Sequence, residues 1–365
     1  MLSLFRRKPE PVPQTFNERV AAFWSWFQEV APHYYATIEA GKCASLADET
    51  SANVDLLGKG FAWVYGPGEG GKGHSLTVCG EGYIHAQLLA LQWLKFAPKI
   101  EGWTFYAARQ PGPIRGHVIE MYNLRFDPKE IWVTTVLDEH QEKFDIYVWH
   151  HAWEGLEERK KFGILFLFLD EALGEYGTGR WIGEIKLSKD RLAQSFPLEE
   201  LADRVNKSAS ERKWKLHAPG EIWTILKINR VEGTYPRSDL TTLSTAVPKL
   251  LHQYMESEGE LADPLAGTGA DYVYASIEKD FFPEGNEVAR RGQIEDAIES
   301  ALAPIQGGRI VSGGFGTERG YIDVLVFDGR RSLELMRRAL VEQRVPRGTM
   351  IEFFAREKRG QRIAA

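Results

Sequence analysis

The sequence predicts an α+β protein of two domains, the second with a ferredoxin-like fold. Three observations support this prediction. From Tyr272 onward, strand and helix patterns follow the order βαββαβ, which is the order of the split βαβ arrangement. All eleven tryptophans lie between Trp24 and Trp223, so the composition changes along the chain. Residues 261–270 (LADPLAGTGA) are rich in Gly, Ala and Pro, as expected for a linker between domains.

Six segments make up the predicted C-terminal domain. Strands are expected at residues 272–281, 308–314, 321–327 and 350–356, and amphipathic helices at residues 287–303 and 332–342. Right-handed crossovers would place both helices on one face of a four-stranded antiparallel sheet. The other face would then be open to water, to a partner or to the first domain.

The tryptophan-rich domain is predicted to mix helices and strands. Helices are expected at residues 16–40, 83–96 and 156–173, and strands at residues 60–66, 74–80, 102–109, 116–124, 130–138, 143–151, 181–187 and 221–228. Pro32 lies inside the first helix and predicts a kink or a break there. The expected division is a tail (1–14), the tryptophan-rich domain (15–235), a helix and linker (236–270), the ferredoxin-like domain (271–358) and a basic tail (359–365).

Composition excludes several classes of protein. The 365 residues are 43% hydrophobic and 26% charged with a net charge of -6, which excludes a disordered, collagen-like or coiled-coil chain. Cys43 and Cys79 are too few for a disulfide framework or for a zinc site of their own. The longest apolar run, residues 162–169, is too short to span a membrane, and residues 1–13 lack the apolar core of a secretion signal. We expect a cytoplasmic protein without membrane contact.

The glycine-rich segment 66–73 (GPGEGGKG) approaches the pattern of a phosphate-binding loop. It departs from that pattern at Gly73, where a hydroxyl should hold magnesium, and a strand follows it instead of a helix. We therefore interpret it as a flexible hairpin loop and keep Lys72 as a candidate anion contact. A second glycine-rich segment, 312–320, lies between two strands and is also interpreted as a hairpin tip.

Carboxylates near the end of the predicted helix 156–173 form the best candidate for a catalytic site. Asp170, Glu171 and Glu175 lie close together in sequence, and paired carboxylates perform acid–base catalysis when one of them is desolvated. Gly174 and Gly177 instead favour an ordinary helix end at the surface. Arg109 and Arg115, in the proline-bearing loop 107–115, are candidates for binding an acidic group.

The histidine pair His150–His151 is not expected to bind a metal. Adjacent side chains on a strand point to opposite faces, and no other spaced histidine or cysteine supports the pair. We therefore predict neither a metal site nor a cofactor.

The segment 319–327 partly matches an RNA-recognition signature, which begins with a basic residue, glycine and an aromatic residue on the third strand. Arg319 and Tyr321 match, and Tyr272 and Tyr274 add aromatic surface on the first strand. Asp323, however, stands where a second stacking aromatic belongs. Residues 330–365 carry a net charge of +6, which keeps RNA contact through phosphates as an alternative.

Residues 86–111 (AQLLALQWLKFAPKIEGWTFYAARQP) and 168–175 (FLDEALGE) resemble an uncharacterised bacterial domain family with an AP-x-x-x-GW pattern. This resemblance covers the first two-thirds of the chain and implies no activity. Residues 272–356 resemble in layout the bacterial ribonuclease E inhibitor family, regulator of ribonuclease activity B. That family is acidic whereas this end is basic, so the resemblance implies a regulatory role without any residue-level assignment.

These observations predict a protein-binding or regulatory protein whose partner is another protein or a second copy of the chain. No set of catalytic residues converges in the sequence, and the predicted sheet has a free face. The alternatives are a hydrolase or transferase that uses Asp170, Glu171 or Glu175 with Arg109, and RNA binding through the basic C-terminal end.

Overall fold

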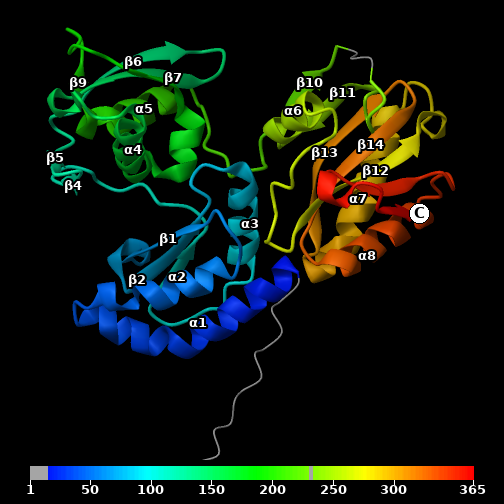
Figure 1. The fold of residues 1–365 in the computed structure, drawn as a ribbon, viewed down its shortest axis with the longest axis horizontal. Helices are drawn as coiled ribbons and strands as arrows, with labels where there is room; N and C mark the ends of the chain where they lie inside the picture. Colours follow the sequence, from blue (N-terminus) through cyan, green and yellow to red (C-terminus); the bar gives the residue numbers. More distant parts are fainter. Residues whose placement is uncertain (1–14, 230–232) are drawn as a thin grey trace, which may run out of the picture. The chain divides into compact units, whose positions relative to one another are not determined.

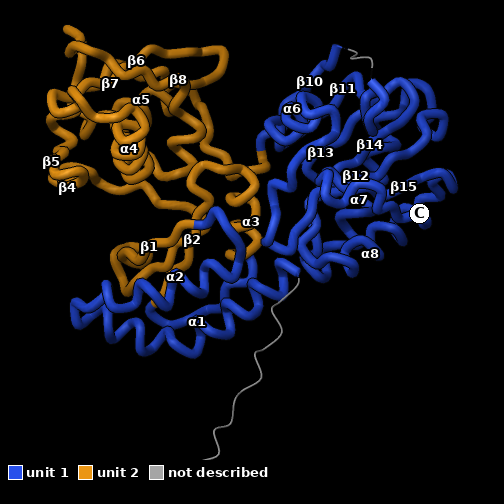
Figure 2. The backbone as a smooth tube through the Cα atoms, in the orientation of Figure 1, with its two compact units in different colours: residues 1–61, 95–102, 222–365 blue, residues 62–94, 103–221 orange. Residues whose placement is uncertain are grey.

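The computed structural model describes residues 15–229 and 233–365 and contains both helices and strands, which confirms the α+β class (Figure 1). The chain forms two compact units (Figure 2). Unit 1 comprises the described parts of Met1–Phe61, Lys95–Gly102 and Ile222–Ala365, and unit 2 comprises Ala62–Leu94 and Trp103–Glu221. This division differs from the predicted domains, because the N-terminal segment belongs with the C-terminal sheet.

A seven-stranded sheet is the centre of unit 1. Its four central strands, in spatial order, are β13 (Gly308–Gly316), β14 (Arg319–Val326), β12 (Asp271–Glu278) and β15 (Met350–Phe353), and all neighbouring pairs are antiparallel. The predicted number of four strands is wrong. β11 (Leu240–Thr245) and β10 (Thr224–Lys227) extend one edge, and β16 (Arg362–Ala364) extends the other. β11 lies in the predicted helix and linker, and β16 lies in the predicted tail.

Two helices, α7 (Glu287–Leu302) and α8 (Gly329–Glu342), pack together on one face of this sheet. Every second residue of β12 and β14 points toward them, since side chains alternate along a strand. Val273, Ile322 and Val324 are fully buried in the resulting core. The sequence predicts that the opposite face is open, but in the structure it is covered. There Tyr274 and Tyr321 are each only 2% exposed, because the segment 233–239 and α6 (Pro248–Glu256) lie against them.

The N-terminal helix α1 (Phe16–Glu39) is fixed to the C-terminal part of unit 1 at its first turn. A capping box formed by Thr15 and Glu18 starts the helix. The Phe16 N–H donates a hydrogen bond to the Gly269 carbonyl (3.2 Å) and the Asn17 N–H to the Phe327 carbonyl (3.1 Å). α1 runs as one helix through Pro32, so the predicted break does not occur, and α2 (Ala47–Asp55) follows it.

Unit 2 contains two sheets. In the first, β1 (Ala62–Pro67) pairs antiparallel with β2 (His74–Cys79), and β2 pairs parallel with β3 (Trp103–Tyr106) after α3 (Ile84–Lys95). The glycine-rich segment thus joins two paired strands as a hairpin loop, which confirms that prediction. The elements of the second sheet, in spatial order, are β8 (Ile182–Leu187), β7 (Lys143–Trp149), β6 (Trp132–Asp138) and β9 (Phe196–Pro197).

Helices α4 (Glu158–Trp181) and α5 (Leu201–Glu211) share a core with the second sheet. The predicted single strand at 116–124 is wrong. Residues 119–126 form a hairpin of β4 (Ile119–Met121) and β5 (Leu124–Phe126), because Tyr122 and Asn123 adopt positive φ and reverse the chain. Among the described residues, no helix combines the length and the apolar character that crossing a membrane requires.

Candidate functional site

A cavity of about 610 Å³ in unit 2 brings together the segments that the sequence singled out. Its walls are β1, the glycine-rich loop, β2, the loop 106–119 and α4. Most lining side chains are apolar, and a few polar groups converge among them, which is the usual composition of a small-molecule site. The lining residues are Val64–Gly70, Ser75, Thr77, Tyr106, Arg109–Pro113, His117, Ile119, Leu167 and Glu171.

A bend in α4 at Gly174 shapes this site. Gly174 has φ 73° and ψ 157°, so the helical hydrogen bonding is interrupted there. The loop that carries Arg109 fills the gap: the Gly112 N–H donates to the Glu171 carbonyl (2.6 Å), and the Glu175 N–H donates to the Arg109 carbonyl (3.0 Å). The first helical segment ends at Leu173, as expected, but this end is not at the surface: Gly174 and Gly177 are buried, and a second helical segment runs on to Trp181. The bend places Arg109 beside the predicted carboxylates.

Glu175 is a structural acceptor beside the cavity. It is 2% exposed, and its Oε1 accepts hydrogen bonds from the Gly82 N–H (2.9 Å) and from Gln87 Nε2 (2.8 Å). Its Oε2 is buried without a hydrogen-bond partner. The Arg109 Nη2 pairs with Glu81 Oε1 at 2.8 Å. Glu175 therefore holds the turn after β2, and Glu81 orients the arginine.

Asp170 lies near these groups, and its carboxyl group has a shifted pKa. Burial raises the pKa of Asp170 to about 6; the charge of Glu175 adds to the shift, and the charge of Arg109 opposes it. A carboxyl group that titrates close to neutral pH can release or take up a proton under physiological conditions. The structure thus gives Asp170 the desolvation that the sequence argument requires of a catalytic carboxylate.

His117 is a titratable residue of the cavity that the sequence does not single out. Its Nδ1 is hydrogen-bonded to Glu171 Oε1, and both residues line the cavity. A carboxylate bonded to one ring nitrogen fixes the orientation of the imidazole and leaves the other nitrogen for a substrate or water. The available signal was the position of His117 beside the proline-rich loop of Arg109 and Arg115. The predicted strand at 116–124 gives no indication that His117 lies in a loop beside a cavity.

The glycine-rich loop does not form a phosphate cradle. Four backbone N–H groups of the loop are already hydrogen-bonded within unit 2. The Gly68 N–H donates to the Gly73 carbonyl, and the Glu69 N–H donates to Thr104 Oγ1. The Gly71 N–H donates to the Gly68 carbonyl, and the Lys72 N–H donates to the Glu69 carbonyl. These amides are not available to a ligand. Lys72 does not line the cavity, and Arg115, whose side chain is 74% exposed, pairs with Glu199 at 3.5 Å outside it. The loop therefore acts as a wall that brings backbone close to the cavity.

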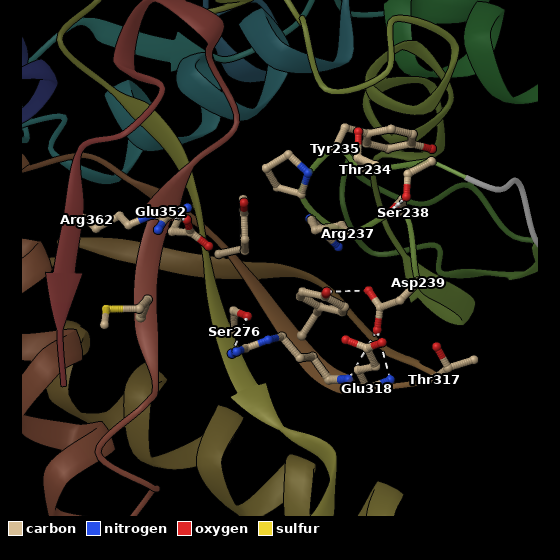
Figure 3. A pocket seen from close by; sticks show the side chains of 16 residues that line it. Thr234, Tyr235, Arg237, Ser238, Asp239, Ser276, Thr317, Glu318, Glu352 and Arg362 are labelled. Atoms are coloured by element: carbon tan, nitrogen blue, oxygen red, sulfur yellow. Dashed lines mark hydrogen bonds and ion pairs between the residues drawn. The ribbon is translucent and has the colours of Figure 1, made fainter.

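A second cavity, of about 560 Å³, lies in unit 1. Asp239 and Glu318 stand on one side of it, and Glu352 and Arg362 on the other (Figure 3). Most of its charges are engaged by the protein itself. Asp239 accepts hydrogen bonds from the Tyr321 hydroxyl (2.5 Å) and from two backbone N–H groups, and Glu352 pairs with Arg362 at 2.7 Å. This cavity is the weaker candidate for a site.

A buried arginine beneath that cavity explains why the sheet face is closed. The Arg237 side chain is 2% exposed, and its Nη2 donates to Asp323 Oδ2 at 3.0 Å. Aromatic rings surround its guanidinium, at 4.8 Å from both Tyr274 and Tyr321. Asp323, which weakened the match to the RNA signature, is thus the partner of this arginine.

The candidate RNA contacts are not arranged for stacking on bases. Tyr272 is 3% exposed, and Tyr274 and Tyr321 are buried around Arg237. Arg319 lines the second cavity and donates to the Ser276 hydroxyl (3.3 Å). Seven of the ten basic residues in 330–365 form ion pairs with carboxylates of unit 1. These pairs neutralise much of the positive charge on which phosphate contact would depend.

His150 is buried and His151 is exposed, but their rings do not point to opposite faces, as adjacent residues of a strand would. β7 ends at Trp149, and His151 begins a 3₁₀ turn (His151–Trp153), so the alternation of a strand no longer applies. The ring centroids of His150 and His151 lie 4.3 Å apart.

Of the cysteines, Cys79 is buried, and burial raises the pKa of its thiol to about 12, so it is not a reactive thiolate at neutral pH.

Comparison with protein-family models, with curated proteins and with solved structures gave no match for this chain. The two family resemblances therefore stay predictions.

Proposed function

We propose that the cavity of unit 2 is an active site for acid–base hydrolysis or group transfer on a small molecule with an apolar body. The observation that carries this proposal is the bonded pair His117–Glu171, which faces an apolar cavity beside Arg109. A pocket of this composition, with convergent titratable groups, is where chemistry is expected in a protein of unknown function.

Each polar residue has a distinct part in the proposed reaction. Glu171 orients His117, and His117 acts as general base on a water molecule or a substrate hydroxyl. Arg109 retains N–H groups beyond the one bonded to Glu81, and these stabilise negative charge that develops on the substrate. Asp170 stands near Arg109 and changes the local charge as it titrates.

Chromogenic p-nitrophenyl compounds test the proposal without knowledge of the natural substrate. The full chain is assayed with p-nitrophenyl esters of increasing acyl length, with p-nitrophenyl phosphate and with p-nitrophenyl glycosides. We expect saturable hydrolysis of one class and a loss of at least tenfold in kcat/KM for Glu171→Gln. A matched Glu154→Gln variant changes an exposed carboxylate outside the cavity and should retain the activity. Equal activity in both variants would exclude the assigned role of Glu171.

A protein-binding role is a second candidate, and one observation favours it. We infer for unit 1 a ferredoxin-like core, β12-α7-β13-β14-α8-β15, whose sheet carries β10 as an added edge strand. Ile222, Trp223 and Ile225, in and before β10, are 47%, 42% and 71% exposed. An apolar edge strand is a place where a second chain can add a strand. The partner we propose is a second copy of this chain.

The oligomeric state tests this second candidate. We expect a dimeric mass by light scattering and a monomeric mass for Ile225→Lys. Val288→Lys, at an exposed position of α7, is the matched control and should stay dimeric. A monomeric wild-type protein at high concentration would exclude self-association through β10.

We also propose that the protein works in a cytoplasmic, reducing environment, and its two free cysteines fit this proposal.

A further inference from the structure

We propose that Glu130, His150 and His151 form a binding site for a divalent transition-metal ion, with Zn²⁺ as the first choice. One carboxylate oxygen and one ring nitrogen from each histidine lie within 4.8 Å of one another. None of the three residues lines the cavity of the proposed active site, so this inference is independent of the proposed function.

The pairing of β6 and β7 explains why these residues meet. The antiparallel register sets Trp132 opposite Trp149 at one end of the ladder. The ladder ends at this pair, so His150 and His151 directly follow its end on β7, and Glu130 lies two residues before its start on β6. Residues opposite each other across an antiparallel pair have Cβ atoms about 5 Å apart. The start of one strand and the end of the next therefore bring a carboxylate and two imidazoles to one place.

The turn after β7 directs both rings to the same place. His150 is extended (φ -148°, ψ 138°), and the 3₁₀ turn begins directly after it. The rings of Phe126 and Trp153 pack against His150, with centroids 5.3 and 6.1 Å away. His150 is 2% exposed and is held in the core, whereas His151 is exposed at the surface. The candidate site thus combines one buried and one exposed imidazole ligand.

The hydrogen bonding of His150 leaves one ring nitrogen unused. Its Nδ1 accepts a hydrogen bond from the Ala152 N–H at 3.2 Å, and its Nε2 is buried without a partner. A buried ring nitrogen without a partner is costly. A metal-bound imidazole keeps its proton on the other nitrogen, so coordination through either nitrogen breaks the bond from Ala152. The Ala152 amide thus reports directly on metal binding.

The donor set indicates the class of ion. Two imidazoles and a carboxylate suit Zn²⁺ and related transition metals, whereas Mg²⁺ and Ca²⁺ prefer oxygen ligands alone. Ligand atoms on one zinc ion lie roughly 3.3 Å apart, given metal–ligand distances of about 2.0 Å. The three donors, which lie within 4.8 Å of one another, therefore have to approach by at most about 1.5 Å, which the surface side chain of His151 can supply. Three protein ligands leave a coordination position for water.

Titration of the metal-free full chain tests the site. We expect one equivalent of Zn²⁺ by calorimetry, one equivalent of Co²⁺ with visible absorption of nitrogen and oxygen ligands, and no binding of Mg²⁺ or Ca²⁺. His151→Ala and Glu130→Gln should each weaken Zn²⁺ binding at least tenfold. Both change surface side chains, so neither should unfold the protein. His217→Ala removes an exposed histidine that also has a carboxylate neighbour, Glu221 at 3.8 Å, and should leave binding unchanged.

Nuclear magnetic resonance identifies the ligands in the same titration. The Ala152 amide signal should shift on addition of Zn²⁺, and the shift should be absent in His151→Ala. Thiolate absorption of the Co²⁺ complex would place the ion on Cys43 or Cys79 and would overturn the proposal. Equal Zn²⁺ affinity in wild type and in both ligand variants, or no binding at millimolar Zn²⁺, would overturn it as well.

Discussion

At the residue scale, the carboxylates of unit 2 divide into two functions that the sequence cannot separate. Glu171 lines the cavity and is hydrogen-bonded to His117. Glu175 is buried and accepts hydrogen bonds from the Gly82 N–H and the Gln87 side-chain amide. Both sit in the same stretch of α4, four positions apart. Their roles differ because the bend at Gly174 turns the chain between them.

Glu175 is expected to tolerate glutamine but not alanine. Glu175→Ala leaves the Gly82 N–H and the Gln87 amide without an acceptor and opens a cavity, at a cost of about 2–4 kcal/mol in the free energy of unfolding. Glu175→Gln keeps the accepting oxygen, and its nitrogen replaces an oxygen that has no partner. Its stability should stay within about 1 kcal/mol of wild type. Urea denaturation measures both; equal losses would contradict the assignment.

Asp170 is expected to make stability depend on pH in the acid range. Its pKa is about 6 in the folded protein against 3.8 as its ordinary value, so the folded state binds the proton more tightly. The contribution of Asp170 to stability therefore falls as pH rises from about 4 to about 6 and is constant above. Asp170→Asn should stabilise the protein by about 1–3 kcal/mol at pH 7.5 and not near pH 4.

Urea denaturation at both pH values measures this effect, with the exposed Asp190→Asn as control. The control should leave stability unchanged at either pH. A destabilised Asp170→Asn protein at pH 7.5 would mean that attraction to Arg109 outweighs the cost of burial.

At the scale of elements, the site depends on one interrupted helix. α4 gives up regular hydrogen bonding at Gly174, and the loop 109–112 supplies the missing partners through two backbone hydrogen bonds. This exchange joins the two parts of the cavity wall, which lie about sixty positions apart in the sequence.

Gly174→Ala is expected to destabilise the protein by about 2–4 kcal/mol. An added Cβ would lie 2.9 Å from Pro111 Cδ and 3.1 Å from the Arg109 carbonyl oxygen, at a backbone φ that disfavours alanine. Gly163→Ala, in the same helix, meets nothing within 4 Å and should stabilise by up to about 1 kcal/mol. Thermal denaturation compares the two variants. Equal melting temperatures would show that the bend is not required.

The sequence could predict the elements of unit 1 better than their surroundings. The alternation in β12 and β14 and the apolar stripes of α7 and α8 are local patterns, so their positions and pairing follow from local rules. The sequence could not predict that Arg237 covers the sheet. A single arginine in a polar loop carries no local pattern that indicates burial or an ion pair with Asp323. β11 was missed because its residues (LTTLST) show no strict alternation.

The candidate site was predicted in part. Arg109, Asp170 and Glu171 were named from residue type and spacing. Arg109 and Glu171 line one cavity, and Asp170 lies near enough to Arg109 for their charges to interact. Gly174 was interpreted as a helix end because a bend and an end have the same local signature. The loop 109–112 packs against Gly174 and makes it a bend instead of an end. A contact between segments so far apart in the sequence produces no periodic pattern in either of them. His117 was hidden for the same reason.

At the scale of the whole molecule, the order of segments in sequence does not match their division into units. The chain passes between the units after Phe61, Leu94, Gly102 and Glu221. Residues before Phe61 complete the unit that contains the C-terminal sheet. A fragment cut at the predicted boundary before residue 236 would therefore lack part of its own core.

Phe16 is expected to stabilise unit 1 from the far end of the chain. Its ring is fully buried, 6.2 Å from the ring of Phe327 and 6.4 Å from that of Phe61. Phe16→Ala should cost about 3–5 kcal/mol and speed hydrogen exchange in β14 and α8. Leu56→Ala, at a position that is 51% exposed, should change stability by less than about 0.5 kcal/mol. Unchanged exchange in β14 would contradict the assignment of α1 to unit 1.

The most direct test of the proposed active site is the kcat/KM of His117→Gln on the p-nitrophenyl compound that the wild type hydrolyses fastest. His117 reaches the cavity from an exposed loop, so its replacement should not unfold the protein. Loss of the general base should lower kcat/KM by about 10²–10⁴-fold, while the exposed control His140→Gln stays at the wild-type value. A His117→Gln protein as active as the wild type would contradict acid–base catalysis in this cavity.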